Sequence, residues 1–260
     1  MKKLYCIAVR SESQLDAEII SAVDYIIFSP AEYNLKTVRN FSVFSFQFSV
    51  PVFLDLPAVA MSKDMKILRG ILSGGQIRER LAGVVANNVY ALTLADEYGL
   101  KVFKGMEMNT LNDNFCPFEN IVLSPELYEK EYRLFKDWDK KNYFLCVYGY
   151  LPLMTLAHCP YKINGFDCKT CGQAKLQYKD ELNNVMNISR VKISNCYFKL
   201  LNSVPLDLLK YKNQIKPHYY FDMRETDKET IKKILRLYKE PGNKDPDGKH
   251  TTGLYFKDVK

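Results

Sequence analysis

Hydrophobic and polar positions follow one another in blocks along this chain. Short runs rich in β-branched and aromatic residues are separated by longer amphipathic stretches. A short apolar run bounded by polar or turn-forming residues is typical of a parallel strand that is buried on both faces. Eight such runs occur, at residues 4–9, 24–29, 51–56, 81–86, 101–106, 120–125, 143–149 and 218–223.

The stretches between these runs predict helices. An order of strand, helix, strand, repeated along the chain, is the pattern of an α/β fold. We therefore predict one domain, residues 1–260, folded as a β/α (TIM-like) barrel. A doubly wound open sheet is the alternative, because the number of strands does not establish that the sheet closes. The predicted helices cover residues 11–22, 31–40, 62–73, 89–98, 125–140 and 226–239.

The regular spacing is interrupted once, after the seventh predicted strand. Residues of about 150–210 form a polar, β-rich insertion that carries a cluster of cysteines. In a β/α barrel, the segments that follow the carboxyl ends of the strands build the active site. We therefore expect the chemistry of the protein in or beside this insertion. The tail, about 240–260, begins with turn-forming residues and is predicted to be irregular.

Composition indicates a folded protein with a basic surface. The chain has 260 residues, of which 47% are hydrophobic and 26% charged, which excludes a disordered protein. The formal net charge is +7, and the lysines are spread along the chain. Such a charge favours anionic partners such as RNA, and it is equally typical of a solvated basic surface.

The apolar runs are too short for a membrane span, which needs about 20 apolar residues. The apolar stretch near the N-terminus ends at Arg10, which is too short for the core of a signal peptide. We therefore expect a cytoplasmic protein without a membrane span. Structural disulfides are rare in that compartment, and the total of seven cysteines is odd. Clustered cysteines are then expected to bind a metal or to be catalytic.

Four cysteines have the spacing of a metal centre. Cys159, Cys168 and Cys171 are separated by eight and then two residues, and Cys196 follows after a further 24. Four thiolates complete the coordination of zinc or of an iron-sulfur cluster. A second two-residue spacing, which is typical of a structural zinc ribbon, is absent. The alternative interpretation is four reduced cysteines that are close only in sequence.

The remaining cysteines and the histidines give no other catalytic pattern. Cys6 and Cys146 lie in apolar runs, where a cysteine behaves as a small hydrophobic residue, and Cys116 is isolated. A thiol protease needs a cysteine beside a basic histidine. His158 adjoins Cys159, but residues that are neighbours in sequence seldom face each other. The alternative is that His158 is an ordinary loop residue or a hydrogen-bond donor beside the cysteines.

Several stretches resemble the collagenase-like peptidases of unknown catalytic type, peptidase family U-32. The most specific is YGYLPLM followed by the cysteines, and then a cysteine shortly before LNS. The matches follow the family's order and cover most of the chain, although the N-terminal third matches weakly. The matching stretches are 106–113, 121–127, 147–160, 166–172, 195–209 and 251–259.

The resemblance implies a β/α barrel whose four cysteines hold a four-iron four-sulfur cluster, with zinc as the alternative. The implied ligands are Cys159, Cys168, Cys171 and Cys196. Family members of this kind serve the oxygen-independent hydroxylation of RNA bases or of a quinone precursor, and others carry a collagenase name. Residues in the matching stretches that are candidates for lining a substrate pocket are Asn109, Glu126, Tyr148, His158 and Asn202.

Each pocket candidate also has a structural interpretation. Glu126 begins a predicted helix in the sequence SPEL and is equally typical of a helix start. Asn109 and Asn202 are typical of turns, and Tyr148 of a core. The chain departs from the family at Tyr150, where arginine is usual, and at residues 179–184, where an aspartate-arginine pair is usual. Both departures remove positive charge from an implied anion pocket.

Three functions are therefore open. The first is an iron-sulfur enzyme for oxygen-independent hydroxylation of RNA bases or a small aromatic substrate. The second is a peptidase, although the sequence shows no Ser/His/Asp order and no HExxH motif. The third is a non-catalytic, metal-stabilised protein that acts as the partner subunit of another protein.

Overall fold

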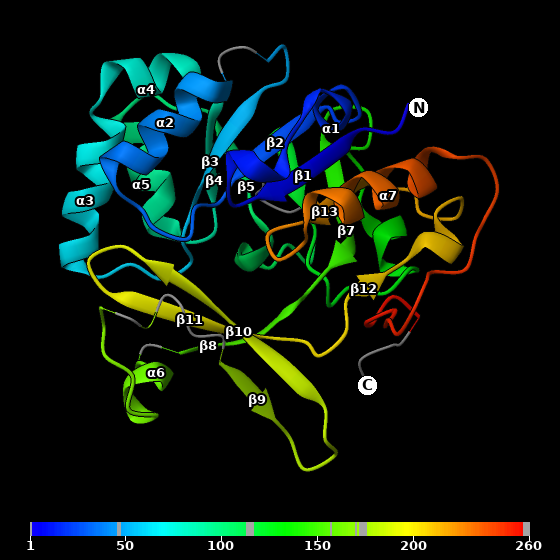
Figure 1. The fold of residues 1–260 in the computed structure, drawn as a ribbon. Helices are drawn as coiled ribbons and strands as arrows, with labels where there is room; N and C mark the ends of the chain where they lie inside the picture. Colours follow the sequence, from blue (N-terminus) through cyan, green and yellow to red (C-terminus); the bar gives the residue numbers. More distant parts are fainter. Residues whose placement is uncertain are drawn as a thin grey trace.

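The barrel predicted from the strand pattern is present. The computed structural model describes residues 2–45, 48–112, 117–156, 158–169, 171 and 176–256. Within these ranges, eight parallel strands close into a barrel because β6 pairs with both β5 and β7 (Figure 1). In chain order the strands are β1 (Tyr5–Val9), β2 (Tyr25–Phe28), β3 (Val52–Leu56), β4 (Gly83–Ala86), β5 (Val102–Lys104), β6 (Asn120–Val122), β7 (Asn142–Gly149) and β13 (His218–Asp222).

Each of the eight predicted apolar runs contains one barrel strand. Their side chains fill the barrel and the layer between the strands and the outer helices, where Leu54, Val84, Phe103 and Phe144 are fully buried. Strands covered on both faces must be apolar on both faces, which explains why these runs do not alternate with polar residues. Cys6 and Cys146 belong to this core, as predicted, and Cys116 lies outside the described residues.

Helices cover the outside of the barrel between most of the strands. Helix α7 shows why they form: Asp227 caps its first turn by accepting a hydrogen bond from the Thr230 amide at 3.0 Å. Ile231, Ile234 and Leu235 then form its buried face. The helices are α1 (Ala17–Ser21), α2 (Leu35–Ser45), α3 (Ser62–Leu72), α4 (Gly75–Arg80), α5 (Val89–Glu97) and α7 (Lys228–Lys239).

The helix predicted over residues 125–140 is wrong. This segment contains turns and a single short 3-10 helix, η3 (Glu131–Leu134). Its aromatic side chains bond to main-chain carbonyls that a helix would use: Tyr132 Oη donates to Leu127 O at 2.9 Å, and Trp138 Nε1 donates to Phe135 O. Tertiary aromatic packing therefore holds the segment in turns, and Glu126 does not begin a helix.

The insertion forms a sheet of its own. Within the described residues, β8 (Pro152–Leu156), β11 (Cys196–Leu201), β10 (Val185–Lys192) and β9 (Gln177–Lys179) pair antiparallel in that spatial order. The short helix α6 (Pro160–Ile163) lies between β8 and β9, and β12 (Leu206–Asp207) then pairs with β7 on the outside of the barrel. The sheet lies beside one end of the barrel in Figure 1.

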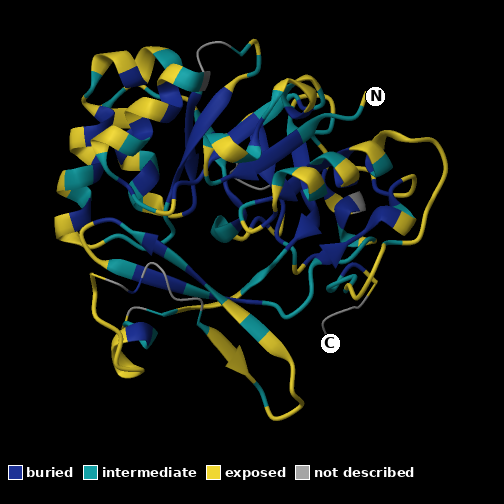
Figure 2. Ribbon diagram, in the orientation of Figure 1, coloured by how far each residue is buried: buried dark blue, intermediate teal, exposed yellow. Residues whose placement is uncertain are grey.

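Burial differs sharply between the barrel and the insertion. Figure 2 shows buried barrel strands and an exposed hairpin of β9 and β10 that projects away from them. After α7, the chain from Glu240 to His250 is exposed apart from one half-buried residue and has no regular structure. None of the helices in the described ranges has the length and apolar character needed to cross a membrane.

Candidate functional site

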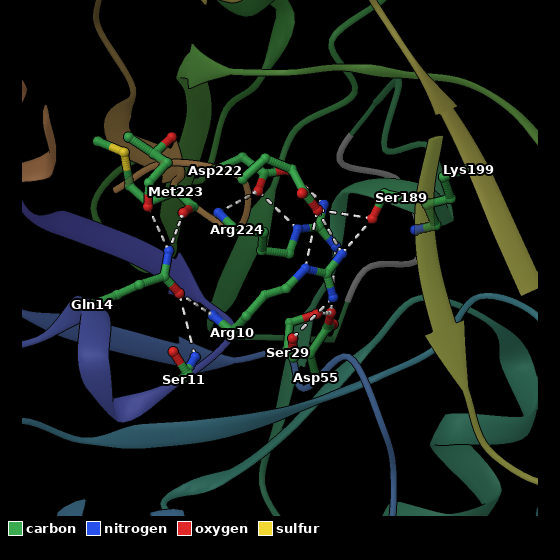
Figure 3. Close-up of polar contacts among 12 residues, drawn as sticks. Arg10, Ser11, Gln14, Ser29, Asp55, Ser189, Lys199, Asp222, Met223 and Arg224 are labelled. Atoms are coloured by element: carbon green, nitrogen blue, oxygen red, sulfur yellow. Dashed lines mark hydrogen bonds and ion pairs between the residues drawn. The ribbon is translucent and has the colours of Figure 1, made fainter. Parts of the chain in front are cut away.

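Polar side chains gather where the barrel strands end, at the barrel mouth (Figure 3). Arg10 directly follows β1, Ser29 follows β2, and Asp55 lies near the end of β3. Asp222 ends β13, and Arg224 follows two residues later. Carboxyl ends of parallel barrel strands meet at one face, so residues that are distant in sequence converge there.

Arg224 forms the centre of this group. Its Nε donates to Asp222 Oδ1 at 2.7 Å, and its Nη1 lies 3.7 Å from Asp55 Oδ2. The exposed fractions of the Arg224 and Asp222 side chains are only 11% and 5%. Burial alone would raise the pKa of Asp222, but the charge and hydrogen bonds of Arg224 outweigh it and lower that pKa. The pair is therefore ionised and bidentate.

Close packing at the end of β7 brings Asp222 into place. Gly149 has a φ of +140° and lies opposite Asp222, beside a break in the register between β7 and β13. A Cβ atom at Gly149 would lie 2.6 Å from the main-chain oxygen of Asp222. Only glycine permits this approach without displacement of the strand.

Asp55 has a different environment, because its closest partners are neutral. Ser29 Oγ and Asn87 Nδ2 each donate to a carboxylate oxygen of Asp55 at 2.6 Å. Burial raises the pKa of this carboxyl, although the charge of Arg224 and the bond from Ser29 oppose the rise. A carboxyl whose pKa is raised at the end of a barrel strand is suited to accept and return a proton.

Side chains of the insertion bond to side chains at the mouth. Arg10 Nη2 donates to Ser189 Oγ of β10 at 2.6 Å, and the same hydroxyl lies 2.8 Å from Glu225 Oε1. Lys199 of β11 forms an ion pair with Glu107, which follows β5, and both side chains are largely buried. Arg10 Nη2 also lies 2.8 Å from Glu225 Oε1, so Arg10, Lys199 and Arg224 each have a carboxylate partner.

The hairpin of β10 and β11 separates the mouth from the outer side of the insertion. Alternate residues of a strand face opposite sides, and Val191, Tyr197 and Lys199 line a mouth cavity with Asp55 and Arg224. That cavity has a volume of about 20 Å³, enough for about one water molecule. The described side chains therefore nearly fill this cavity.

A second small cavity lies beside Tyr150, where the resemblance would place arginine. Arg10 and Arg224 line it, together with Lys199 and Asp222. Positive charge is thus present around Tyr150, supplied by residues that follow β1 and β13 and by the insertion. The sequence pattern did not anticipate this arrangement, since these cations are remote from Tyr150 along the chain.

Asp64 docks the turn between β10 and β11 onto α3. Its carboxylate accepts hydrogen bonds from the Ser194 amide at 2.9 Å, from the Ser194 hydroxyl and from Tyr197 Oη, and it also accepts one from the Met61 amide at 2.8 Å. Burial opposes ionisation, but these donors outweigh it and lower the pKa of Asp64 to about 2. This contact fixes the turn immediately before Cys196.

The four predicted ligand cysteines line one pocket on the outer side of the insertion. Cys159 precedes α6, Cys168 and Cys171 follow it, and Cys196 begins β11. The pocket has a volume of about 670 Å³ and is also lined by the basic residues Lys169, Arg190 and Lys192. The structure therefore brings together the four cysteines that the spacing singled out, and we call this the cysteine pocket.

The contacts within the cysteine pocket centre on the thiol of Cys171. Arg190 Nη1 donates to Cys171 Sγ at 3.0 Å, and Cys171 Sγ lies 3.5 Å from the Cys168 carbonyl oxygen. Burial raises the pKa of Cys196, which the charge of Arg190 opposes and the nearby Cys171 and Cys159 reinforce. Cys159 and Cys171 therefore lie near Cys196.

The donor set fits a thiolate-ligated group, and the pocket is wider than a mononuclear site. Zinc holds each sulfur at about 2.3 Å and would draw four of them into close contact. Among the described residues, no three His, Cys, Asp or Glu side chains are arranged to hold one metal ion. In a four-iron four-sulfur cluster each cysteine binds its own iron, so the sulfurs stand further apart. Four thiols that line one pocket therefore provide the donor set of either group.

The other predicted pocket residues lie elsewhere. Tyr148 is in the core, where burial raises its pKa to about 12. Asn109 is exposed with a φ of +43° after a 3-10 turn, and Asn202 accepts from the Ser203 amide at 3.0 Å, as expected of turn residues. Glu126 and His158 are exposed. Within the described residues, none of these five lines the mouth cavities or the cysteine pocket.

The mouth residues were missed by sequence reasoning, although a signal was present. Asp55 and Asp222 are charged residues inside predicted apolar strands, and Arg10 directly follows another. Charge at the end of an otherwise buried strand indicates a site at the barrel mouth. Lys199 is not a charged residue at the end of a predicted apolar strand. Lys199 and Glu107 pair only because the insertion packs against the barrel mouth.

No protein-family model and no curated protein sequence matches this chain. Several solved structures are similar to it at low identity, among them the following three. A chitinase from Chromobacterium violaceum is 8% identical with a TM-score of 0.39, and the match covers 91% of this chain and 99% of that one. The spore cortex-lytic enzyme SleL of Bacillus megaterium is 11% identical with a TM-score of 0.35, over 94% and 75%. An uncharacterised Bacillus cereus protein is 12% identical with a TM-score of 0.36, over 93% and 66%.

Proposed function

We propose that this protein is an iron-sulfur protein of the peptidase U-32 type whose cysteine pocket holds a four-iron four-sulfur cluster. The observation that carries the proposal is that Cys159, Cys168, Cys171 and Cys196 line one pocket although they come from three separate segments. Thiolates are the ligands that iron-sulfur clusters require. Zinc is the alternative occupant.

A bound cluster would supply electron transfer, and the chain's own residues would provide the rest of the site. Arg190, Lys169 and Lys192 would offset the negative charge of four thiolates. Asp64 holds the turn that carries Cys196 against α3. On the inner side of the hairpin, Asp55 is placed to exchange a proton at the barrel mouth.

The reaction that we propose is an oxygen-independent hydroxylation of RNA bases or of a small aromatic substrate. This choice rests on the resemblance, and the net charge of +7 is consistent with an anionic partner. The substrate would bind at the barrel mouth, which is where barrel enzymes place their reacting groups. Entry requires the hairpin of β10 and β11 to move, because the mouth cavity now has room for about one water molecule.

Anaerobic iron and sulfide analysis tests the cluster. Wild type purified without oxygen is expected to be brown and to contain iron and acid-labile sulfide in equal amounts. Single alanine substitutions of the four pocket cysteines are expected to lower both. Cys146→Ala is the matched control, because this cysteine is buried in β7 away from the pocket. A colourless wild type that contains zinc would contradict the iron assignment.

A separate experiment tests the reaction. RNA from a strain that lacks the protein is expected to lose a hydroxylated base, which mass spectrometry of digested RNA would detect. Complementation with wild type should restore it, and complementation with Cys196→Ala should not. If every hydroxylated base and every hydroxylated quinone precursor persists, the chain is better described as a non-catalytic partner subunit.

One observation favours a second function, hydrolysis at the barrel mouth, in line with the peptidase name of the family. Asp55, with a raised pKa, shares a cavity with the carboxylate of Glu107 and with Lys199. Paired carboxylates in different environments serve as acid and base in hydrolases. Cleavage of denatured collagen that is lost in Asp55→Asn but survives Cys159→Ser and chelation would establish this function instead.

A further inference from the structure

Arg190 is the residue of the cysteine pocket whose contact with a sulfur is most direct. It lies on β10 opposite Phe198 of β11, so its side chain emerges on the outer side of the hairpin. Its neighbours in sequence, Ser189 and Val191, instead face the barrel mouth. Because side chains alternate along a strand, the guanidinium of Arg190 lies on the side of the hairpin where the cysteines are.

The guanidinium contacts one of the four cysteine sulfurs. Arg190 Nη1 donates to Cys171 Sγ at 3.0 Å, which is short for a bond to sulfur. Cys196, the first residue of β11, lines the same pocket. Arg190 thus contacts the cysteine that follows α6, inside the pocket that all four cysteines line.

The other cations of the pocket differ from Arg190. Lys192 forms a solvent-exposed ion pair with Glu32 at 3.0 Å, and Lys169 is exposed. Among the described contacts, neither donates to a sulfur. Arg190, by contrast, is half-buried and its Nη1 is directed at a thiol. Among the described cations of the pocket, Arg190 therefore has the geometry to act on a group that the cysteines bind.

Charge near a thiolate-ligated cluster changes its reduction potential. Reduction adds an electron to a group that is already negative, so a nearby cation and a hydrogen bond to a ligating sulfur stabilise the reduced form. Arginine suits this position because it stays charged and presents several donors in a rigid plane. Lysine at the same position would keep the charge without that plane.

We propose that Arg190 is a positioning residue that holds Cys171 by an N–H to sulfur hydrogen bond and raises the reduction potential of the bound cluster. This inference rests on the proposed function, since it requires a cluster in the cysteine pocket. It assigns to Arg190 a role that neither the cysteine spacing nor the resemblance gives.

The test is a redox titration of the anaerobic holoprotein, followed by absorbance and by electron paramagnetic resonance of the reduced form. The variants are Arg190→Gln, which removes the charge, and Arg190→Lys, which keeps it. Lys192→Gln is the matched control, because it removes a pocket cation that makes no described contact with sulfur. Iron and sulfide per chain are measured for each protein beside the midpoint potential.

The expected result is a midpoint potential that falls in Arg190→Gln, falls less in Arg190→Lys, and falls least in Lys192→Gln. If Arg190→Gln loses iron while Arg190→Lys keeps it with a lowered potential, the role of the guanidinium is also supported. Full iron content with the wild-type potential in Arg190→Gln would overturn the inference and leave the cluster assignment intact. Wild type without iron would instead overturn the proposed function.

Discussion

The barrel mouth and the cysteine pocket lie on opposite sides of the same two strands, and their construction differs. At the mouth, Arg224 and Asp222 are buried and bonded to each other, and the cavity is nearly filled. In the cysteine pocket, Cys168 is exposed and the pocket is wide. The charged groups at the barrel mouth thus have other side chains of the protein as their hydrogen-bond and ion-pair partners. In the cysteine pocket, by contrast, four thiols line a volume of about 670 Å³ that the described side chains leave unfilled.

The largest expected effect is loss of stability on removal of the mouth arginine. Arg224→Met leaves Asp222 buried without its partner, so we expect the free energy of unfolding to fall by about 3–5 kcal/mol. The matched change in the cysteine pocket, Arg190→Met, should cost the apoprotein about 0–1 kcal/mol, because Arg190 is partly solvated. Urea denaturation of both variants provides the measurement. Equal losses would remove the contrast between the two sides of the hairpin.

Acid should destabilise the barrel before the insertion, through His218. Burial lowers the pKa of this histidine to about 4, below the unfolded value of 6.5. The neutral histidine therefore gives the folded state its full stabilisation above pH 6.5. This stabilisation declines as the pH falls toward 4. We expect a loss of about 2 kcal/mol between pH 7 and pH 5. Denaturation curves at both values for wild type and His218→Gln would reveal it, and an unchanged pH dependence in the variant would contradict this assignment.

Asp64 should make the stability of the insertion depend on pH, at a lower pH than that at which His218 affects the barrel. Its pKa of about 2 lies below the unfolded value of 3.8, so its contribution is complete above pH 4 and is lost as the pH falls through 2. Asp64→Asn is expected to cost about 1–2 kcal/mol at pH 7 and less at pH 3. Hydrogen exchange should rise mainly in β10 and β11. A rise spread evenly over the barrel would show that Asp64 does not dock the hairpin specifically.

The smallest expected effect is at the solvent-exposed ion pair between Lys192 and Glu32, where both side chains are more than 40% exposed. Lys192→Ala should change the free energy of unfolding by less than about 1 kcal/mol, because water screens the pair. Thermal denaturation at low and high salt would measure it. A loss as large as that of Arg224→Met would mean that the outer side of the insertion contributes far more to stability than its exposure indicates.

The barrel was predictable because its strands are covered on both faces, so Leu54 and Phe144 belong to continuous apolar runs. The cysteine grouping was predictable because ligand residues are few and their spacing is constrained. The turns around Tyr132 were not predictable, since they depend on aromatic contacts with residues outside the segment, namely Tyr143 just beyond it and Tyr255 far along the chain. Secondary-structure preference is weak when such tertiary packing opposes it.

The polar network at the mouth was unpredictable for a related reason. Asp55 and Asp222 lie in strands that the sequence located correctly, but their partner Arg224 approaches only when the barrel closes. Lys199 meets Glu107 only when the insertion folds back over the mouth. Long-range pairings of this kind leave no periodic trace in the sequence, whereas strands and capped helices do.

We propose that four cysteine sulfurs share one inorganic group beside the barrel. X-ray absorption at the iron edge of anaerobically purified protein tests it most directly, because the spectrum reports which atoms surround the metal. The expected spectrum shows iron with a shell of sulfur neighbours and a second shell of iron at short distance. Iron surrounded by oxygen or nitrogen alone, or a sulfur-ligated zinc with no iron, would contradict it.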